Sequence, residues 1–174
     1  MNRKKIDYTE YANVITKALE KGIFLTSKAE GKENCMVIGW GHIGTLWGRP
    51  TFHVYVRQSR YTKGQLDKTG EFTVSVPLDD IVPAINKVCG SQSGFDTDKV
   101  KEAGLTIVEP ETINTPGIKE YPLTVECKVL YFQDQDSEKI PGDIIKRYYP
   151  ETAHCQCDFH TMYVGEIVDA YIIR

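Results

Sequence analysis

The residues best suited to chemistry stand together between positions 57 and 62. Arg57, Ser59, Arg60 and Thr62 combine two guanidinium groups, which give paired N–H donors to phosphate oxygens, with two hydroxyls. A helix predicted to begin at Thr62 would present free backbone N–H groups at the same place. The pattern favours an anion site. The alternative is a solvated basic strand end, which is the commoner fate of charge clusters in general.

Three nearby glycines suggest a different phosphate site. Gly39, Gly41 and Gly44 have the G-x-G-x-x-G spacing after a predicted strand. A dinucleotide-binding site of this type needs a helix that opens at the third glycine. Gly48 and Pro50 follow instead and exclude that helix, and a strand comes after them. We therefore interpret residues 41–50 as a wide loop between two strands and not as a Rossmann motif.

Potential metal ligands cluster near the C-terminus at His154, Cys155, Cys157 and His160. Imidazole and thiolate are zinc ligands, but structural zinc sites usually add a second, distant ligand pair. We expect no metal here and interpret the cysteines as small apolar side chains. His160, like His42 and His53, is a candidate proton donor or a hydrogen-bonded structural residue.

Composition predicts one soluble globular domain over residues 1–174, with 41% hydrophobic and 26% charged residues. The net charge of −3 gives no indication of nucleic acid or an anionic membrane as partner. The chain contains no apolar run of the roughly 20 residues that cross a bilayer, and no signal peptide. Five scattered cysteines in such a chain favour reduced thiols and a cytoplasmic location.

Hydrophobic periodicity predicts a mainly β protein. Asp7 and Glu10 have capping-box spacing and begin a helix over residues 7–22, which we expect to pack on a sheet or on a second subunit. Thr62 and Gln65 repeat that spacing. Strands are predicted at residues 23–27, 34–40, 51–56, 71–76, 105–108, 122–132 and 163–173, further helices at 62–70, 79–88, 98–103 and 141–149, and a loop at 89–99. Such strands with short connections imply an antiparallel barrel with short peripheral helices.

Four stretches, in order, resemble the flavin reductase-like family, whose fold is the FMN-binding split β-barrel, antiparallel and Greek-key-like. They are NCMVIGWGHIGTLWGRPTFHVYVRQSRYT, LDKTGEFTVSVP, CGSQSGFDTDKVKEAGLT and FHTMYVGEIVDAYI. The likeness covers about residues 22–173, and four spaced signatures are more specific than any single motif above. Phe95 stands where the family pattern has arginine, which replaces a charge with an apolar ring.

The resemblance implies a homodimer that holds FMN non-covalently near the subunit interface. Along the isoalloxazine ring and ribityl chain it places Asn34, Met36, Val37 and Trp40. At the phosphate it places Ser59, Arg60, Tyr61 and Thr62, which agrees with the anion site that includes Arg57. At the remaining edge it places Cys89, Gly90, Ser91, Ser93, Gly94 and Lys99. His160 matches a family histidine near the reactive face of the flavin, where nicotinamide would approach.

The activity that the resemblance implies is electron transfer from NADH or NADPH through bound FMN to an acceptor such as flavin, ferric iron, a redox protein or oxygen. One alternative is a flavoredoxin-like electron carrier that reacts poorly with NAD(P)H and takes electrons from a partner protein. A second alternative is a non-redox barrel that binds another ligand, such as haem or a nucleotide.

Overall fold

The computed structural model describes residues 2–80, 82–151 and 157–174. Its main sheet has eight strands in the order β3-β2-β6-β9-β10-β5-β4, with β1 added beside β10. Every ladder in it is antiparallel. The strands are β1 Arg3–Lys5, β2 Ile23–Ala29, β3 Lys32–Ile38, β4 Gly41–Leu46, β5 Arg49–Arg57, β6 Glu71–Val76, β9 Leu123–Asp134 and β10 His160–Ile173. This arrangement confirms the predicted mainly β, antiparallel fold.

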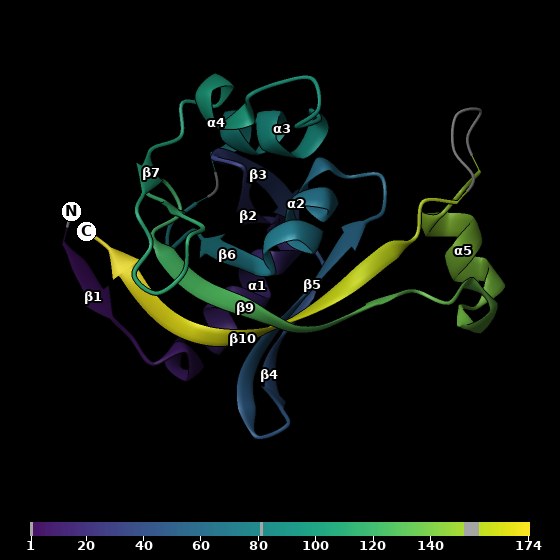
Figure 1. The fold of residues 1–174 in the computed structure, drawn as a ribbon, viewed down its shortest axis with the longest axis horizontal. Helices are drawn as coiled ribbons and strands as arrows, with labels where there is room; N and C mark the ends of the chain where they lie inside the picture. Colours follow the sequence, from purple (N-terminus) through teal and green to yellow (C-terminus); the bar gives the residue numbers. More distant parts are fainter. Residues whose placement is uncertain (1, 81, 152–156) are drawn as a thin grey trace.

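Short helices surround the sheet. They are the 3₁₀ helices η1 Tyr8–Tyr11 and η2 Ser137–Lys139 and the α-helices α1 Ala12–Lys21, α2 Tyr61–Thr69, α3 Pro83–Ser91, α4 Lys99–Glu102 and α5 Gly142–Tyr148. A second, two-stranded sheet pairs β7 Ile107–Val108 with β8 Gly117–Ile118. In Figure 1, α3 and α4 lie together near β3, whereas α5 lies at the far end of the long β9–β10 ribbon. Among the described helices, none is both long and apolar enough to cross a membrane.

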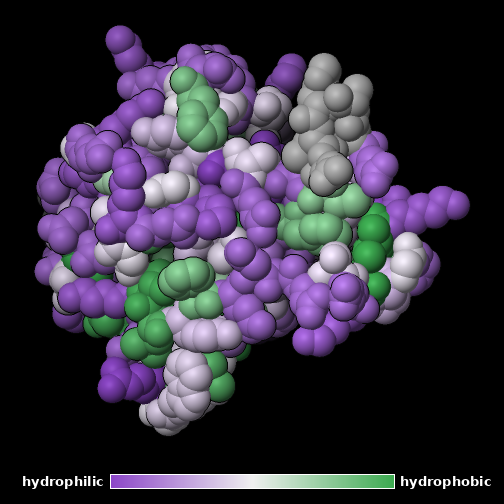
Figure 2. Space-filling view, turned by 45° about the vertical axis from the view of Figure 1, so that its right-hand side comes forward, coloured by the Kyte–Doolittle hydropathy of each residue, from purple (hydrophilic) through white to green (hydrophobic). Residues whose placement is uncertain are grey.

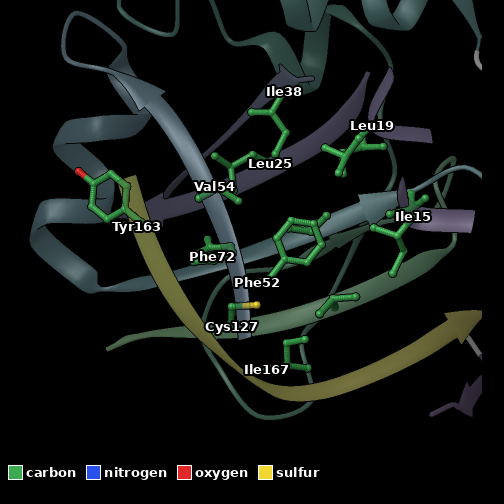
Figure 3. Packing of buried hydrophobic residues seen from close by; sticks show 14 of the residues in the cluster. Ile15, Leu19, Leu25, Ile38, Phe52, Val54, Phe72, Cys127, Tyr163 and Ile167 are labelled. Carbon is green, nitrogen blue, oxygen red and sulfur yellow. The ribbon is translucent and has the colours of Figure 1, made fainter. Parts of the chain in front are cut away.

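The hydrophobic core fills the inside of the curved sheet. Phe52, Val54 and Phe72 are fully buried there, because alternate residues of a strand point to the same face. Figure 3 shows these side chains converging with those of Leu25 and Ile167, while the Tyr163 hydroxyl points away from them. The sheet therefore curves around its largest apolar cluster, while polar side chains such as Thr73 and Glu126 are buried elsewhere on its strands.

The predicted N-terminal helix is a two-part element. The Asp7 carboxylate caps η1 by accepting the Thr9 N–H at 2.9 Å, and α1 follows. Ile15 and Leu19 of α1 are buried against the barrel core, which places this helix on the barrel. The helix ends at Gly22, whose φ of 98° is open mainly to glycine.

The predicted wide loop at residues 41–50 is wrong. Residues 41–46 form β4, which pairs with β5 from Gly41 opposite Val54 to Leu46 opposite Arg49. The two strands are joined by Trp47 and Gly48, whose φ angles of 53° and 70° are those of a two-residue hairpin turn. The glycines hid the strand from a pattern search, because glycine is depleted in strands.

Two other local predictions are corrected. The predicted loop at 89–99 starts too early, because α3 continues to Ser91, whose Oγ donates to the Lys87 carbonyl at 2.6 Å. The predicted capping box of Thr62 and Gln65 is absent, since α2 begins at Tyr61 and has no side-chain cap. The Thr62 hydroxyl instead accepts from Asn34, and Gln65 accepts from the Ser27 hydroxyl.

Candidate functional site

Three adjoining cavities form one groove across the ends of β3, β5 and β10. The central cavity, of about 180 Å³, is lined by Met36, Val37, Ile38, Gly39, Trp40, Tyr55, Arg57, Arg60 and His160. On one side lies a polar cradle lined by Asn34, Met36, Arg60, Tyr61, Thr62, Gln92, Ser93, Gly94 and Lys99. On the other side lies an arginine pocket of about 520 Å³, lined by Arg57, Ser59, Arg60, Arg147, Tyr148, Pro150 and Asp158. Arg60 lines all three, so one cation links the whole groove.

The central cavity has an aliphatic and aromatic wall. β3 supplies Met36 and Val37, and Trp40 follows directly after the strand. The Trp40 ring is 40% exposed, with its centroid 4.7 Å from that of His160 and 5.4 Å from that of Tyr148. A wall of this kind suits one face of a flat conjugated ring.

The polar cradle is built at the first turn of α2. Because Arg60 at the N-cap makes no side-chain cap, the N–H groups of Tyr61 and Thr62 at the start of α2 are available to an anion, whereas the Lys63 N–H donates to the Arg60 carbonyl at 3.0 Å. Asn34 donates its Nδ2 to Thr62 Oγ1 at 2.8 Å, so the Thr62 hydroxyl keeps its own proton for another acceptor. A Cβ at Gly94 would lie 2.5 Å from Asn34 Oδ1 and 2.7 Å from the Tyr61 ring. Only glycine therefore fits this wall.

Lys99 closes the floor of the cradle. Its side chain is 5% exposed, and Nζ donates to the Cys89 carbonyl at 3.2 Å. Burial lowers the pKa of the Lys99 ammonium, while Cys35 and Cys89 nearby act to raise it. An ammonium group has three donors. Lys99 therefore adds a buried cation with donor capacity to a cradle whose other cationic side chain is the exposed Arg60.

The arginine pocket is more exposed than the cradle, and backbone carbonyls fix the position of Arg57 in it. Arg57 donates to the carbonyls of Asp158 at 2.8 Å and Tyr148 at 2.9 Å, and its guanidinium lies 5.2 Å from the centre of the Tyr149 ring. Ser59 donates its backbone N–H and its hydroxyl to the Asp158 carboxylate, at 3.0 and 2.5 Å. A phosphate at Ser59 would therefore have to displace Asp158.

His160 lines the central cavity beside Trp40. Burial, followed by the Arg57 charge, lowers its pKa to about 4, so the imidazole is neutral at pH 7. Its Nδ1 lies 2.9 Å from the Tyr149 hydroxyl, and the side chain is 7% exposed. A neutral, fixed imidazole can orient a ligand through one hydrogen bond.

The structure brings most of the predicted site residues to this groove. Those that line it are Asn34, Met36, Val37, Trp40, Arg57, Ser59, Arg60, Tyr61, Thr62, Ser93, Gly94, Lys99 and His160. Cys89, Gly90 and Ser91 line none of the three cavities, because they lie in the last turn of α3. Phe95 is 68% exposed and rests edge-on against Tyr61, with the ring centres 5.0 Å apart.

Sequence reasoning missed several residues that line the groove. Tyr55 was detectable, since it stands two positions before Arg57 on one strand and shares its face. Arg147, Tyr148 and Asp158 carried no usable signal, because they are distant in sequence and reach the groove only through the β9–β10 ribbon. His154 and Cys155, two of the potential metal ligands, lie outside the described residues. Within residues 2–80, 82–151 and 157–174, no group of three His, Cys, Asp or Glu side chains could hold a metal ion.

The sequence pattern of the family described as flavin reductase like domain matches residues 21–174. An uncharacterized protein of Archaeoglobus fulgidus is 27% identical over 160 residues, which is 92% of this chain and 77% of that protein.

Solved structures share the fold of this chain. An FMN-binding domain of a flavin reductases-like enzyme from Shewanella baltica superposes with a TM-score of 0.69 at 17% identity, covering 98% of this chain and 77% of its own. A flavoredoxin from Methanosarcina acetivorans superposes with a TM-score of 0.64 at 26% identity, covering 88% and 68%. With a family match that spans nearly the whole sequence, the chain belongs to the flavin reductase-like domain family.

Proposed function

We propose that this protein is an FMN-binding oxidoreductase that passes electrons from NADH or NADPH through FMN to an acceptor such as flavin, ferric iron or a redox protein. The observation that carries the proposal is the continuous groove, in which Arg60 joins an aromatic wall to an uncapped helix start. A flavin nucleotide has the matching parts, a flat ring at one end and a phosphate at the other.

The donor set of the groove fits FMN. Ring contacts would come from Met36, Val37 and Trp40, and phosphate contacts from Arg60, Thr62 and the first N–H groups of α2. The cradle encloses about 10 Å³, close to the volume that holds one water, so a phosphate could enter only if lining side chains moved. Asn34, Thr62 and Lys99 of the cradle are already held by hydrogen bonds within the chain.

The protein supplies position and electrostatics in this proposal. The bound flavin would accept hydride from the nicotinamide and release electrons to the acceptor. His160, the proposed catalytic residue, would orient the incoming ring from the wall beside Trp40. Arg57 and Arg147 line the neighbouring pocket, where guanidinium groups suit the phosphates of a dinucleotide.

Spectroscopy tests the proposal directly. We expect purified protein to absorb near 450 nm (roughly, as flavins do), or to gain that absorbance on titration with FMN. Anaerobic addition of NADH or NADPH should then bleach the band. Colourless protein that binds no FMN on titration contradicts the proposal. A haem-type or other spectrum would favour the non-redox alternative.

A charge-matched pair of variants tests the site. Arg60→Ala should weaken FMN binding about tenfold to a hundredfold, because a charge-assisted contact to phosphate contributes about 1.5–3 kcal/mol. Lys63→Ala removes the same charge from the same helix, but Lys63 is paired with Asp67 at 2.7 Å and lines none of the three cavities. Equal losses in the two variants would assign the effect to net charge alone.

A second candidate is an electron carrier of the flavoredoxin type. It is favoured by the likeness to the flavoredoxin of Methanosarcina acetivorans, at 26% identity. A carrier would bind FMN as above but take its electrons from a protein. Stopped-flow bleaching separates the two functions: reduction by NADH or NADPH within seconds supports the reductase, and reduction over many minutes supports the carrier.

We also propose a homodimer, as the family resemblance implies. The outer half of β9 exposes Leu130, Tyr131 and Phe132 at 38%, 41% and 58%, and Trp47 at the hairpin tip is 65% exposed beside Tyr131. Figure 2 shows one face of the molecule, on which apolar groups interrupt a mainly hydrophilic surface. A second copy of the chain would cover such aromatics. Phe132→Glu should then convert a dimer to a monomer in light scattering, and a wild-type monomer would contradict the proposal.

We propose the cytoplasm as its compartment. Cys35, Cys89 and Cys127 are buried free thiols in the structure. Free thiols persist in reducing compartments, where disulfides are rare. Fractionation of the native host with an antibody to this protein tests the assignment, and recovery outside the cytoplasm would overturn it.

A further inference from the structure

A buried hydrogen-bond chain stands behind the groove wall at His160. His160 begins β10 and lies opposite Arg57 of β5 in the ladder. Behind it, Tyr149 follows α5 and Gln135 follows β9. Tyr149 is 3% exposed, and its ring is held between the Arg57 guanidinium at 5.2 Å and the Phe159 ring at 4.7 Å. Residues from the ends of α5, β9 and β5 thus meet at the His160 imidazole.

The directions of the hydrogen bonds in this chain can be deduced. The His160 backbone N–H lies 3.1 Å from Gln135 Oε1, and the Tyr149 hydroxyl lies 2.9 Å from the same oxygen. A backbone N–H only donates, so the Gln135 atom must be the amide oxygen, which only accepts. The single proton of the Tyr149 hydroxyl must therefore point to Gln135.

The protonation of His160 follows from that assignment. With its proton used, the Tyr149 oxygen can only accept from His160 Nδ1, which lies 2.9 Å away. Nδ1 therefore carries a proton, and in a neutral imidazole Nε2 is then a bare acceptor. The groups that face the ring are consistent with neutrality: Arg57 and Arg60 lower its pKa, and Asp158 opposes them.

We infer that Tyr149 and Gln135 are positioning residues that hold His160 as the Nδ1-protonated tautomer, so that the groove presents Nε2 as a hydrogen-bond acceptor. The ligand that this wall selects is one with an amide-type N–H donor, as in the imide of a flavin or the carboxamide of nicotinamide. The ligand assignment rests on the proposed function, whereas the tautomer does not. In this state His160 orients a ligand and does not give it a proton from Nε2.

The tautomer is measurable without any ligand. In protein labelled with ¹⁵N-histidine, two-bond ¹H–¹⁵N correlation at pH 7 should show a protonated-type shift for His160 Nδ1 and an unprotonated-type shift for Nε2. Assignment uses the loss of the signals in His160→Asn. The opposite pattern, or a doubly protonated ring, would overturn the inference.

A matched pair of tyrosine variants isolates the cause. Tyr149→Phe keeps the ring between Arg57 and Phe159 but removes the only acceptor assigned to Nδ1, so the proton should move to Nε2 in most molecules. Tyr148→Phe changes the neighbouring tyrosine and should leave the tautomer as in the wild type. An unchanged tautomer in Tyr149→Phe would show that the hydroxyl does not fix the proton.

Ligand binding tests the acceptor role. On saturation with FMN, then with NADH, the Nε2 resonance should shift toward the hydrogen-bonded range without gaining a proton, and Tyr149→Phe should abolish that shift. If neither FMN nor NADH shifts the Nε2 resonance, the inference that this wall selects an N–H donor is overturned. If FMN fails to bind at all, the proposed function falls, while the ligand-free spectrum still decides the tautomer.

Discussion

Glu126 and Arg60 are both charged side chains, but their surroundings are opposite. Glu126 is fully buried on β9, and its carboxylate accepts from the N–H groups of Glu111 and Thr112, at 2.7 and 2.8 Å, and from the Tyr171 hydroxyl, at 2.8 Å. Arg60 is exposed at the junction of three cavities. Within the described part of the chain, it forms no ion pair with a carboxylate.

This difference distinguishes a structural charge from a charge left available for a ligand. A buried carboxylate is tolerated only when donors of the protein satisfy it, and Glu126 is satisfied by its own chain. The groove arginine retains donor groups that the described residues do not use. Removing Glu126 should therefore damage folding, and removing groove residues should damage binding.

The largest effect is expected for Glu126→Ala. It leaves the buried Tyr171 hydroxyl and two backbone N–H groups without their acceptor, so the free energy of unfolding should fall by about 3–5 kcal/mol. Urea unfolding followed by circular dichroism measures it. Lys128→Ala, an exposed change on the same strand, should stay within about 0.5 kcal/mol. Similar losses of unfolding free energy in both variants would show that Glu126 is not a special structural charge.

Gly94→Ala should act on binding. Its Cβ would meet Asn34 and Tyr61 well inside contact distance, and crowding of this kind costs about 1–3 kcal/mol. We expect FMN affinity to fall about tenfold or more, as measured by quenching of flavin fluorescence. Gly90→Ala is the control, because its Cβ would make an ordinary contact with Val37 at 3.5 Å. Unchanged affinity in Gly94→Ala would separate the cradle from the flavin.

His160 should make stability depend on pH. Its pKa is about 4 in the folded protein against 6.5 for the free group, so the unfolded chain binds more protons between these values. The stabilising effect of keeping His160 neutral is complete above pH 6.5 and is lost as the pH falls toward 4. From pH 7.5 to pH 5, ligand-free wild type should lose about 1–2 kcal/mol more than His160→Asn in urea unfolding. Parallel pH profiles would disprove the lowered pKa.

The smallest effect is expected at an exposed ion pair. Lys68 and Glu30 lie 2.8 Å apart, with side chains 57% and 77% exposed. Solvent screening leaves such pairs nearly without net value, so Lys68→Ala should leave both the unfolding midpoint and FMN affinity unchanged within error. A clear loss of stability would mean that solvent exposure does not decide which charged side chains contribute to the free energy of unfolding in this protein.

The fold was predictable where the side-chain pattern was unambiguous. Residues 71–76 alternate without a glycine, and their predicted bounds match β6. β4 was missed because Gly41 and Gly44 removed the alternation, although tertiary pairing with β5 still forms the strand. The end of α3 was missed because Gly90 and Ser91 are typical of loops, yet Gly90 packs against Val37 of β3.

The site was predictable only in its contiguous part. Ser59, Arg60 and Thr62 stand together in sequence, so their residue types indicated an anion site. The Asp158 carboxylate accepts hydrogen bonds from both the backbone N–H and the hydroxyl of Ser59. Nothing in the sequence pattern predicts a contact between residues so far apart in the chain. The same holds for Tyr149, whose contact with His160 depends on how the β9–β10 ribbon returns α5 to the groove.

The chain has only two tryptophans, and the fold puts them in contrasting places. Trp40 stands at the groove beside His160, whereas Trp47 is at the solvent-facing tip of the β4–β5 hairpin. Intrinsic fluorescence therefore carries two separable reporters in the native sequence. Trp47→Phe would leave an emission that reports the proposed ligand in the groove, and Trp40→Phe one that reports the proposed dimer, so the two proposals can be titrated independently without an attached dye.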